Sequence, residues 1–115
     1  MIAHVVGSPN TAATLTLTTF GPGLSVRLTR LHIYRVATLA VTATALLTIS
    51  TTNLPSALQW DVANGVSAFS KTLDIDLSFP EGIVAALPET DVVITLPAPG
   101  LGVSWRGLAV YSMVR

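Results

Sequence analysis

The segment "VATLAVTATALLTIS", from Val36 to Ser50, decides between two kinds of fold. It contains no charged residue, and three arginines precede it, as in a membrane-spanning segment. A spanning helix, however, needs about 20 apolar residues in succession and is indifferent to odd and even positions. Here the odd positions are all apolar, whereas the even positions carry most of the hydroxyl groups: Ala37, Leu39, Val41, Ala43, Ala45, Leu47 and Ile49 against Thr38, Thr42, Thr44, Thr48 and Ser50. Because side chains alternate between the two faces of a strand, this pattern predicts a central β-strand with an apolar core face. If the protein works as part of an assembly, we expect the threonine face to lie partly against a neighbouring subunit or a second layer.

The same alternation recurs along the rest of the chain, in segments 14–18, 73–79, 92–96 and 101–105, and the final segment, 108–115, continues in β-type residues. Turn residues separate these segments, among them "GPG" at 21–23, "NLPS" at 53–56, "NG" at 64–65 and "PAPG" at 97–100. The only plausible helical piece is "PEGIVAALP", residues 80–88. About seven or eight strands with little or no helix predict an all-β fold, an antiparallel β-sandwich in the form of a jelly roll.

Segment 24–36, "LSVRLTRLHIYRV", also alternates, but its apolar parity changes near Leu31. A parity change inside one long strand predicts a β-bulge or a bend.

The length of 115 residues allows one domain, which we place at residues 12–115, with Met1 to Thr11 as an N-terminal arm that orders on assembly. Half of the residues are hydrophobic and 10% are charged, against about 25% charged in ordinary domains. A small domain with this composition is expected to cover part of its apolar surface with a partner or with copies of itself.

Composition also excludes several classes of function. The formal net charge is zero, which argues against a nucleic-acid-binding protein, because such a protein needs a concentrated positive surface. The chain has no cysteine, so we expect neither disulfides nor thiolate metal sites. Because small secreted domains often need disulfides, we expect an intracellular site of synthesis. The start, "MIAHVVGSPN", does not have the pattern of a signal peptide.

Residues able to carry chemistry are few and scattered. Asp74 and Asp76 share one strand face, but a hard cation needs six or more oxygen ligands, so a solvated face that discourages edge pairing is the simpler interpretation. His4 and His32 are the only histidines. No nucleophile elbow or phosphate loop occurs. We therefore expect no enzymatic activity, no catalytic residue, no metal site, no cofactor and no small-molecule substrate.

A local cluster of arginines and a tyrosine is the best candidate for partner binding: Arg27, Arg30, Tyr34 and Arg35. On a regular strand Arg27 and Arg35 would share one face, and Arg30, His32 and Tyr34 the other. The alternative is a solvated strand face with side-chain stems packed along the sheet. Trp60 and Trp105 are further candidates, although core packing is the simpler interpretation of both.

The order of these segments resembles that of the small decoration, or cement, proteins of tailed bacteriophage capsids. The resemblance rests on "RLTRLHIYRV", "ATLAVTATALLTIS", "LQWDV" and the "PAPG" turn before "GVSWRGLAVYSMV", and it covers about Leu24 to Val114. It is a pattern of composition and order, without a binding motif, so no functional residue can be assigned by position.

The resemblance implies a β-sandwich, often a jelly roll, that forms a homodimer or homotrimer and needs no cofactor. Made in the host cytoplasm, it would bind the outer capsid surface of the virion and stabilise the shell by bridging subunits of the major capsid protein. Membrane and nucleic acid would not be its partners. The alternative is a receptor- or carbohydrate-binding β-sandwich of a phage tail or adhesin, with "NLPSALQWD", residues 53–61, as its candidate site.

Overall fold

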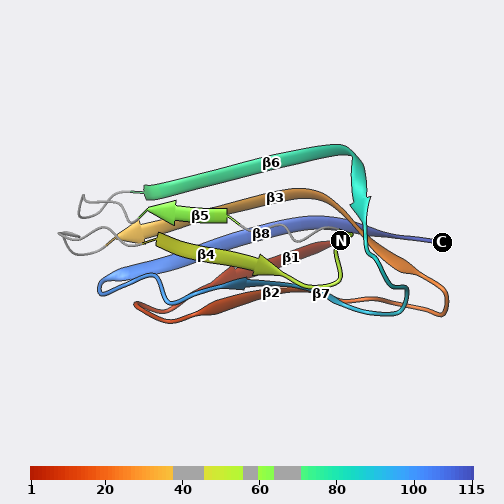
Figure 1. The fold of residues 1–115 in the computed structure, drawn as a ribbon, viewed down its shortest axis with the longest axis horizontal. Coiled ribbons are helices and arrows are strands. Elements are labelled where there is room, and N and C mark those ends of the chain that lie inside the picture. Colours follow the sequence, from red (N-terminus) through yellow and green to blue (C-terminus); the bar gives the residue numbers. More distant parts are fainter. Residues whose placement is uncertain (38–45, 56–59, 64–70) are drawn as a thin grey trace.

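The structure, a computed structural model, describes residues 1–37, 46–55, 60–63 and 71–115. These residues form eight strands and no helix (Figure 1). One four-stranded sheet has the order β1-β8-β3-β6, with β1 at Ile2–Val6, β8 at Val103–Val114, β3 at Ser25–Ala37 and β6 at Lys71–Val84. The other has the order β2-β7-β4-β5, with β2 at Ala13–Leu17, β7 at Val92–Leu96, β4 at Leu46–Thr51 and β5 at Trp60–Ala63. Every pairing is antiparallel, which confirms the predicted antiparallel β-sandwich.

The strands are paired in a nested way. The first strand, β1, pairs with the last, β8. Moving inward along the sequence from both ends, β2 pairs with β7, β3 with β6, and β4 with β5. The pairings of β3 with β8 and of β4 with β7 then join these pairs into two sheets. In consequence β1 and β6 are the edge strands of one sheet, and β2 and β5 those of the other.

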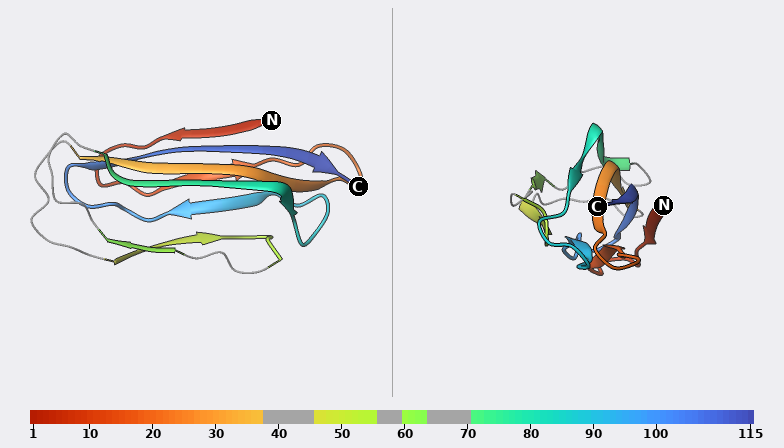
Figure 2. Two further views of the ribbon diagram at one scale, coloured as in Figure 1. Left: turned by 90° about the horizontal axis from the view of Figure 1, so that it is seen from above. Right: turned by 90° about the vertical axis from the view of Figure 1, so that its right-hand side faces the viewer.

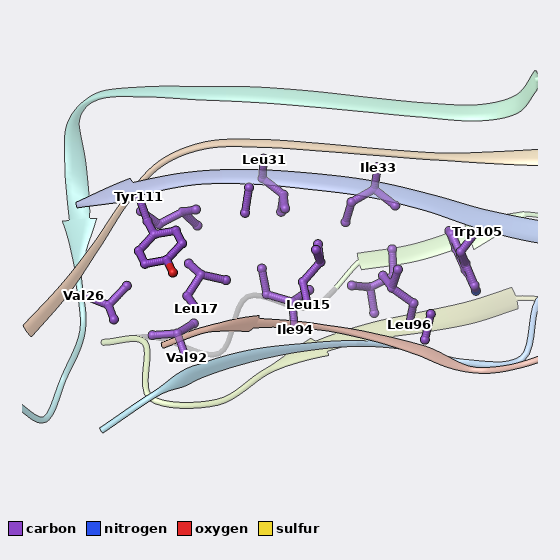
Figure 3. Close-up of a cluster of buried hydrophobic side chains, with 14 of the residues drawn as sticks. Leu15, Leu17, Val26, Leu31, Ile33, Val92, Ile94, Leu96, Trp105 and Tyr111 are labelled. Carbon is purple, nitrogen blue, oxygen red and sulfur yellow. The ribbon is translucent and has the colours of Figure 1, made fainter. Parts of the chain in front are cut away.

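The core lies between the two sheets. Leu31 and Ile33 of β3 point toward Leu15 of β2 and Ile94 of β7, and all four side chains are almost completely buried (Figure 3). Each such residue contributes roughly 1.5–3 kcal/mol to the stability through burial. The odd-numbered side chains of β2 and the even-numbered side chains of β7 are buried. This alternating burial follows directly from the alternation of residue types in the sequence.

The segment from Val36 to Ser50 is not one central strand, contrary to the prediction. Val36 and Ala37 end β3, whereas Leu46 already begins β4 in the other sheet. A single strand from Ser25 to Ser50 would be about 85 Å long at about 3.3 Å per residue, whereas the molecule measures 48 Å along its longest axis. The chain therefore changes sheets within this segment.

The predicted faces hold where the segment is described. Ala37 and Ile49 are fully buried, and Leu47 packs against the core. Thr48 is exposed. The remaining threonines of the segment, at 38, 42 and 44, lie outside the described residues. Across the described ranges there is no helix long and apolar enough to cross a membrane.

The expected helical piece at residues 80–88 is also absent. Pro80 to Val84 belong to β6, which bends sharply there (Figure 1). Pairing with β3 stops after Ser78 and resumes at Ile83. Gly82 has φ of 76°, a left-handed conformation that a glycine adopts at little cost, and this allows the strand to bend instead of coiling into a helix.

The N-terminal segment, Met1 to Thr11, contains β1 and so does not form an arm outside the sandwich. Ala3 and Val5 pack against the core, whereas Ile2 and Val6 are exposed. The reason is again alternation, since "IAHVV" places small apolar side chains at every second position opposite β8. The sandwich therefore begins at Ile2.

Candidate functional site

The predicted change of parity in β3 is a β-bulge at Thr29. The register of β3 shifts between Leu28 and Arg30 against both β6 and β8, and the Thr29 hydroxyl donates a hydrogen bond of 2.9 Å to the Val110 carbonyl. The extra residue brings Arg27 onto the outer face of the sheet together with Arg30, which a regular strand would not do. The predicted bulge is thus confirmed, and it places Arg27 and Arg30 on the same outer face of this sheet.

Cross-strand rows order the outer face. His4 of β1, Leu108 of β8, His32 of β3 and Asp76 of β6 occupy one row. The next row contains Val6, Arg106 and Tyr34, and the row on the other side contains Ile2, Val110, Arg30 and Ser78. Side chains from four strands, far apart in the sequence, therefore lie side by side.

A groove of about 430 Å³ runs over the first two of these rows, along β1, β8 and β3. The rings of His32 and Tyr34 lie on one side of it, with centroids 5.4 Å apart and planes inclined by 37°. The groove combines imidazole, phenol and guanidinium groups with apolar side chains, and its lining residues are His4, Val5, Val6, His32, Tyr34, Arg106, Gly107 and Leu108. Such a mixed surface can bind a partner through aromatic and hydrogen-bonding contacts.

Two of the predicted arginines lie on the same outer face of the sheet, outside the lining of the groove, and each bonds a neighbouring side chain. Arg30 donates two hydrogen bonds to the Asp76 carboxylate, at 3.1 Å from Nε and 3.0 Å from Nη2, and this pair raises the pKa of Arg30. Arg27 donates from Nε to the Ser112 hydroxyl at 3.2 Å. Both side chains are thus oriented by their neighbours, and the Arg30 pair, which is half exposed, contributes little to stability.

Arg106 was not among the predicted residues. Its Nη1 donates hydrogen bonds to the carbonyls of Trp105, at 2.9 Å, and Gly7, at 3.3 Å, so the guanidinium is fixed in the groove. His4 was missed as a binding residue because the N-terminal segment was expected to be an arm. The alternation of "SWR" places Trp105 and Arg106 on opposite faces, and this was the signal that could have identified Arg106.

Arg35 and Trp105 point into the sandwich, so they do not belong to the outer surface. Both have no exposed area, and Cζ of Arg35 lies 5.5 Å from the centroid of the Trp105 ring. Burial lowers the pKa of Arg35. The indole N–H of Trp105 donates to the Pro97 carbonyl at 2.6 Å. The prediction that Trp105 packs in the core is confirmed. Arg35 is also buried in the core, because the bulge places Arg35 and Arg27 on opposite faces of β3.

The remaining candidates add no further chemistry. Trp60 lies in β5 opposite Ile49, but its side chain is outside the described part of the structure. Asp76 binds Arg30, and it lies on the edge strand β6, as expected for a residue that discourages edge pairing. The side chain of Asp74 lies outside the described part. Within the described ranges, no group of three His, Cys, Asp or Glu side chains could hold a metal ion.

The candidate carbohydrate site begins with Asn53, whose side chain is occupied by the backbone. Its amide nitrogen donates to the carbonyls of Leu87, at 3.1 Å, and Thr90, at 2.9 Å, and its oxygen accepts from the Leu87 N–H at 2.8 Å. Asn53 therefore fixes the connection between β6 and β7. Residues 56–59 of this candidate lie outside the described ranges.

Comparison with known proteins finds no matching family model, no matching curated protein and no matching solved structure.

Proposed function

We propose that this chain is a non-enzymatic structural protein that binds the outer surface of a phage capsid as a cement protein, bridging major capsid protein subunits and stabilising the shell. The observation that carries the proposal is the distribution of exposed apolar side chains. The molecule is elongated, 48 Å by 22 Å by 22 Å, and such side chains lie at both of its ends.

At one end, Phe20 and Leu87 are 53% and 59% exposed. They lie in the connections from β2 to β3 and from β6 to β7, which adjoin through a hydrogen bond of 2.8 Å from the Glu89 N–H to the Leu24 carbonyl. At the other end, in the connection from β7 to β8, Leu101 is 77% exposed (Figure 1). Apolar contacts at two ends of a stiff sandwich suit a protein that joins two neighbouring subunits.

The strand order supports the jelly-roll form that the resemblance implies. Nested pairing of eight strands into the sheets β1-β8-β3-β6 and β2-β7-β4-β5 is the arrangement expected when a long hairpin folds over on itself. The low charge of the chain also favours close packing against protein, because burying hydroxyl groups costs less than burying charges.

The test uses capsids assembled without this protein. Wild-type protein should bind them in a saturable way and raise the temperature at which they open and release DNA. Phe20→Asp and Leu101→Asp should each bind more weakly and lose most of this protection, because each disrupts one end of the bridge. Thr16→Asp, which adds the same charge on the exposed face of β2, is the control and should protect like the wild type. If wild-type protein does not bind, the proposal is wrong. If it binds but both end variants behave like the wild type, the bridging role of the ends is wrong.

The carbohydrate-binding alternative has a direct test as well. A sugar that bound at residues 53–61 would change the fluorescence of Trp60, whereas Trp105 is buried and would change little. A saturable change at millimolar sugar would favour this alternative over the capsid proposal.

A further inference from the structure

The outer edge of β1 is open. Among the described strands β1 pairs with β8 alone, and it lies at the margin of the molecule in both views of Figure 2. An open edge presents a row of backbone N–H and C=O groups that can pair with another strand.

The hydrogen bonds between β1 and β8 show which groups face this edge. Gly7 N–H donates to the Trp105 carbonyl at 2.9 Å, and Tyr111 N–H donates to the Met1 carbonyl at 2.9 Å. In an antiparallel ladder, hydrogen-bonded pairs alternate with pairs that are not bonded to each other. The odd residues of β1 therefore bond β8, and the N–H and C=O groups of Ile2, His4 and Val6 point toward the open edge.

Nothing in the sequence of β1 protects this edge. Natural edge strands are commonly guarded by lysine, proline or a bulge, whereas "IAHVV" contains no proline and no lysine and pairs with β8 in an unbroken register. Two of its three exposed side chains are apolar, Ile2 at 65% and Val6 at 58%, and the third is His4. This strand is built to pair rather than to remain free.

The strand is also complementary to itself. In an antiparallel pairing centred on His4, Ile2 faces Val6 of the second copy, Ala3 faces Val5, and His4 faces His4. The even residues then form the hydrogen-bonded pairs, which are the residues whose N–H and C=O groups are available, and about six backbone hydrogen bonds result. The apolar residues on either side of His4 face apolar residues, and no Asp, Glu, Lys or Arg side chain takes part in the pairing.

We propose that β1 pairs with β1 of a second copy of this chain across a two-fold axis at His4, which joins the β1-β8-β3-β6 sheets of two copies into one continuous sheet. Self-complementarity selects a second copy over a foreign strand as the occupant of the edge. The grooves of the two copies then lie next to each other, because His4 lines the groove and also stands at the axis. The proposal rests on the geometry of β1 and is independent of the capsid proposal.

The axis makes a charge-swap experiment possible, because only a residue on the axis faces its own copy. Size-exclusion chromatography with light scattering should give the wild type the mass of two 12.0 kDa chains. His4→Lys and His4→Asp should each weaken the dimer by about tenfold or more, since each places like charges directly opposite each other. An equimolar mixture of the two variants should form the heterodimer with at least wild-type affinity.

Two further variants separate pairing from folding. His4→Pro removes only an N–H that points to the open edge, so it should keep the circular dichroism spectrum and melting temperature of a folded protein but be monomeric. Leu87→Asp, an equally exposed apolar position outside β1, should remain dimeric. A monomeric wild type would overturn the proposal, and so would an oligomer that tolerates His4→Lys and His4→Asp, or a mixture of these variants that stays monomeric. None of these outcomes bears on capsid binding, which is measured separately.

Discussion

Arg35 and Trp105 stack inside the sandwich, with the guanidinium carbon 5.5 Å from the centroid of the indole ring and neither side chain exposed. They are opposite each other in the antiparallel pairing of β3 with β8. A buried arginine is unusual, and its position over the face of a tryptophan supplies both packing for its stem and a favourable contact for its charge.

We expect Arg35→Ala to destabilise the fold by about 2–4 kcal/mol, because it leaves a cavity against Trp105. Arg35→Met fills a similar volume without a charge that must be desolvated, so it should cost less than half as much. Urea unfolding followed by tryptophan fluorescence measures both. An equal loss in the two variants would contradict the packing explanation.

Gly107→Ala should also destabilise the fold, by about 1–3 kcal/mol through overpacking. Gly107 faces the core, and an added Cβ would lie 3.1 Å from Cδ1 of Leu15 and 3.2 Å from Cγ1 of Val5. Chemical denaturation at equilibrium gives the free energy of unfolding. Ser78→Ala, at an exposed position of β6, is the control and should stay within about 0.5 kcal/mol of the wild type.

Gly82→Ala should destabilise the bend in β6 for two reasons that a double-mutant cycle separates. The backbone of Gly82 has φ of 76°, and an added Cβ would also overlap the stem of Arg27. In an Arg27→Ala background the overlap disappears and a backbone cost of about 1 kcal/mol remains. Thermal unfolding of the four proteins should therefore show a smaller effect of Gly82→Ala in that background. An unchanged effect would mean that Arg27 does not restrict the bend.

The ion pair between Arg30 and Asp76 should contribute little to stability and should depend on salt. Both side chains are about half exposed, so water and ions screen their attraction. A double-mutant cycle with Arg30→Ala and Asp76→Ala should give a small favourable coupling in low salt that disappears in molar sodium chloride. A coupling that persists in high salt would indicate a shielded pair.

Only those residues of the candidate site that lie on a single strand, β3, could be predicted from the sequence. Arg27, Arg30 and Tyr34 lie on the outer face of β3, as the pattern of that strand and its bulge indicate. Arg35 and Trp105 were assigned to a possible binding surface, but their parity places them in the core. His4 and Arg106 escaped notice because they come beside His32 and Tyr34 only through the pairing of β1 with β8 and of β8 with β3, whereas the sequence of a single strand gives only the face of each residue.

The sequence by itself determined that this protein is a sandwich of antiparallel strands, that β3 contains a bulge, and which face of strands such as β2 and β7 is buried. Alternation is a local property of an extended chain, so it can be read from neighbouring residues. Tertiary structure alone decided that the segment from Val36 to Ser50 is shared between β3 and β4 in different sheets, that "IAHVV" becomes an edge strand, and that β1, β3 and β8 together build the groove. These outcomes depend on which strands pair and on how long a sheet the core can support, and both are settled by contacts between residues far apart in the chain.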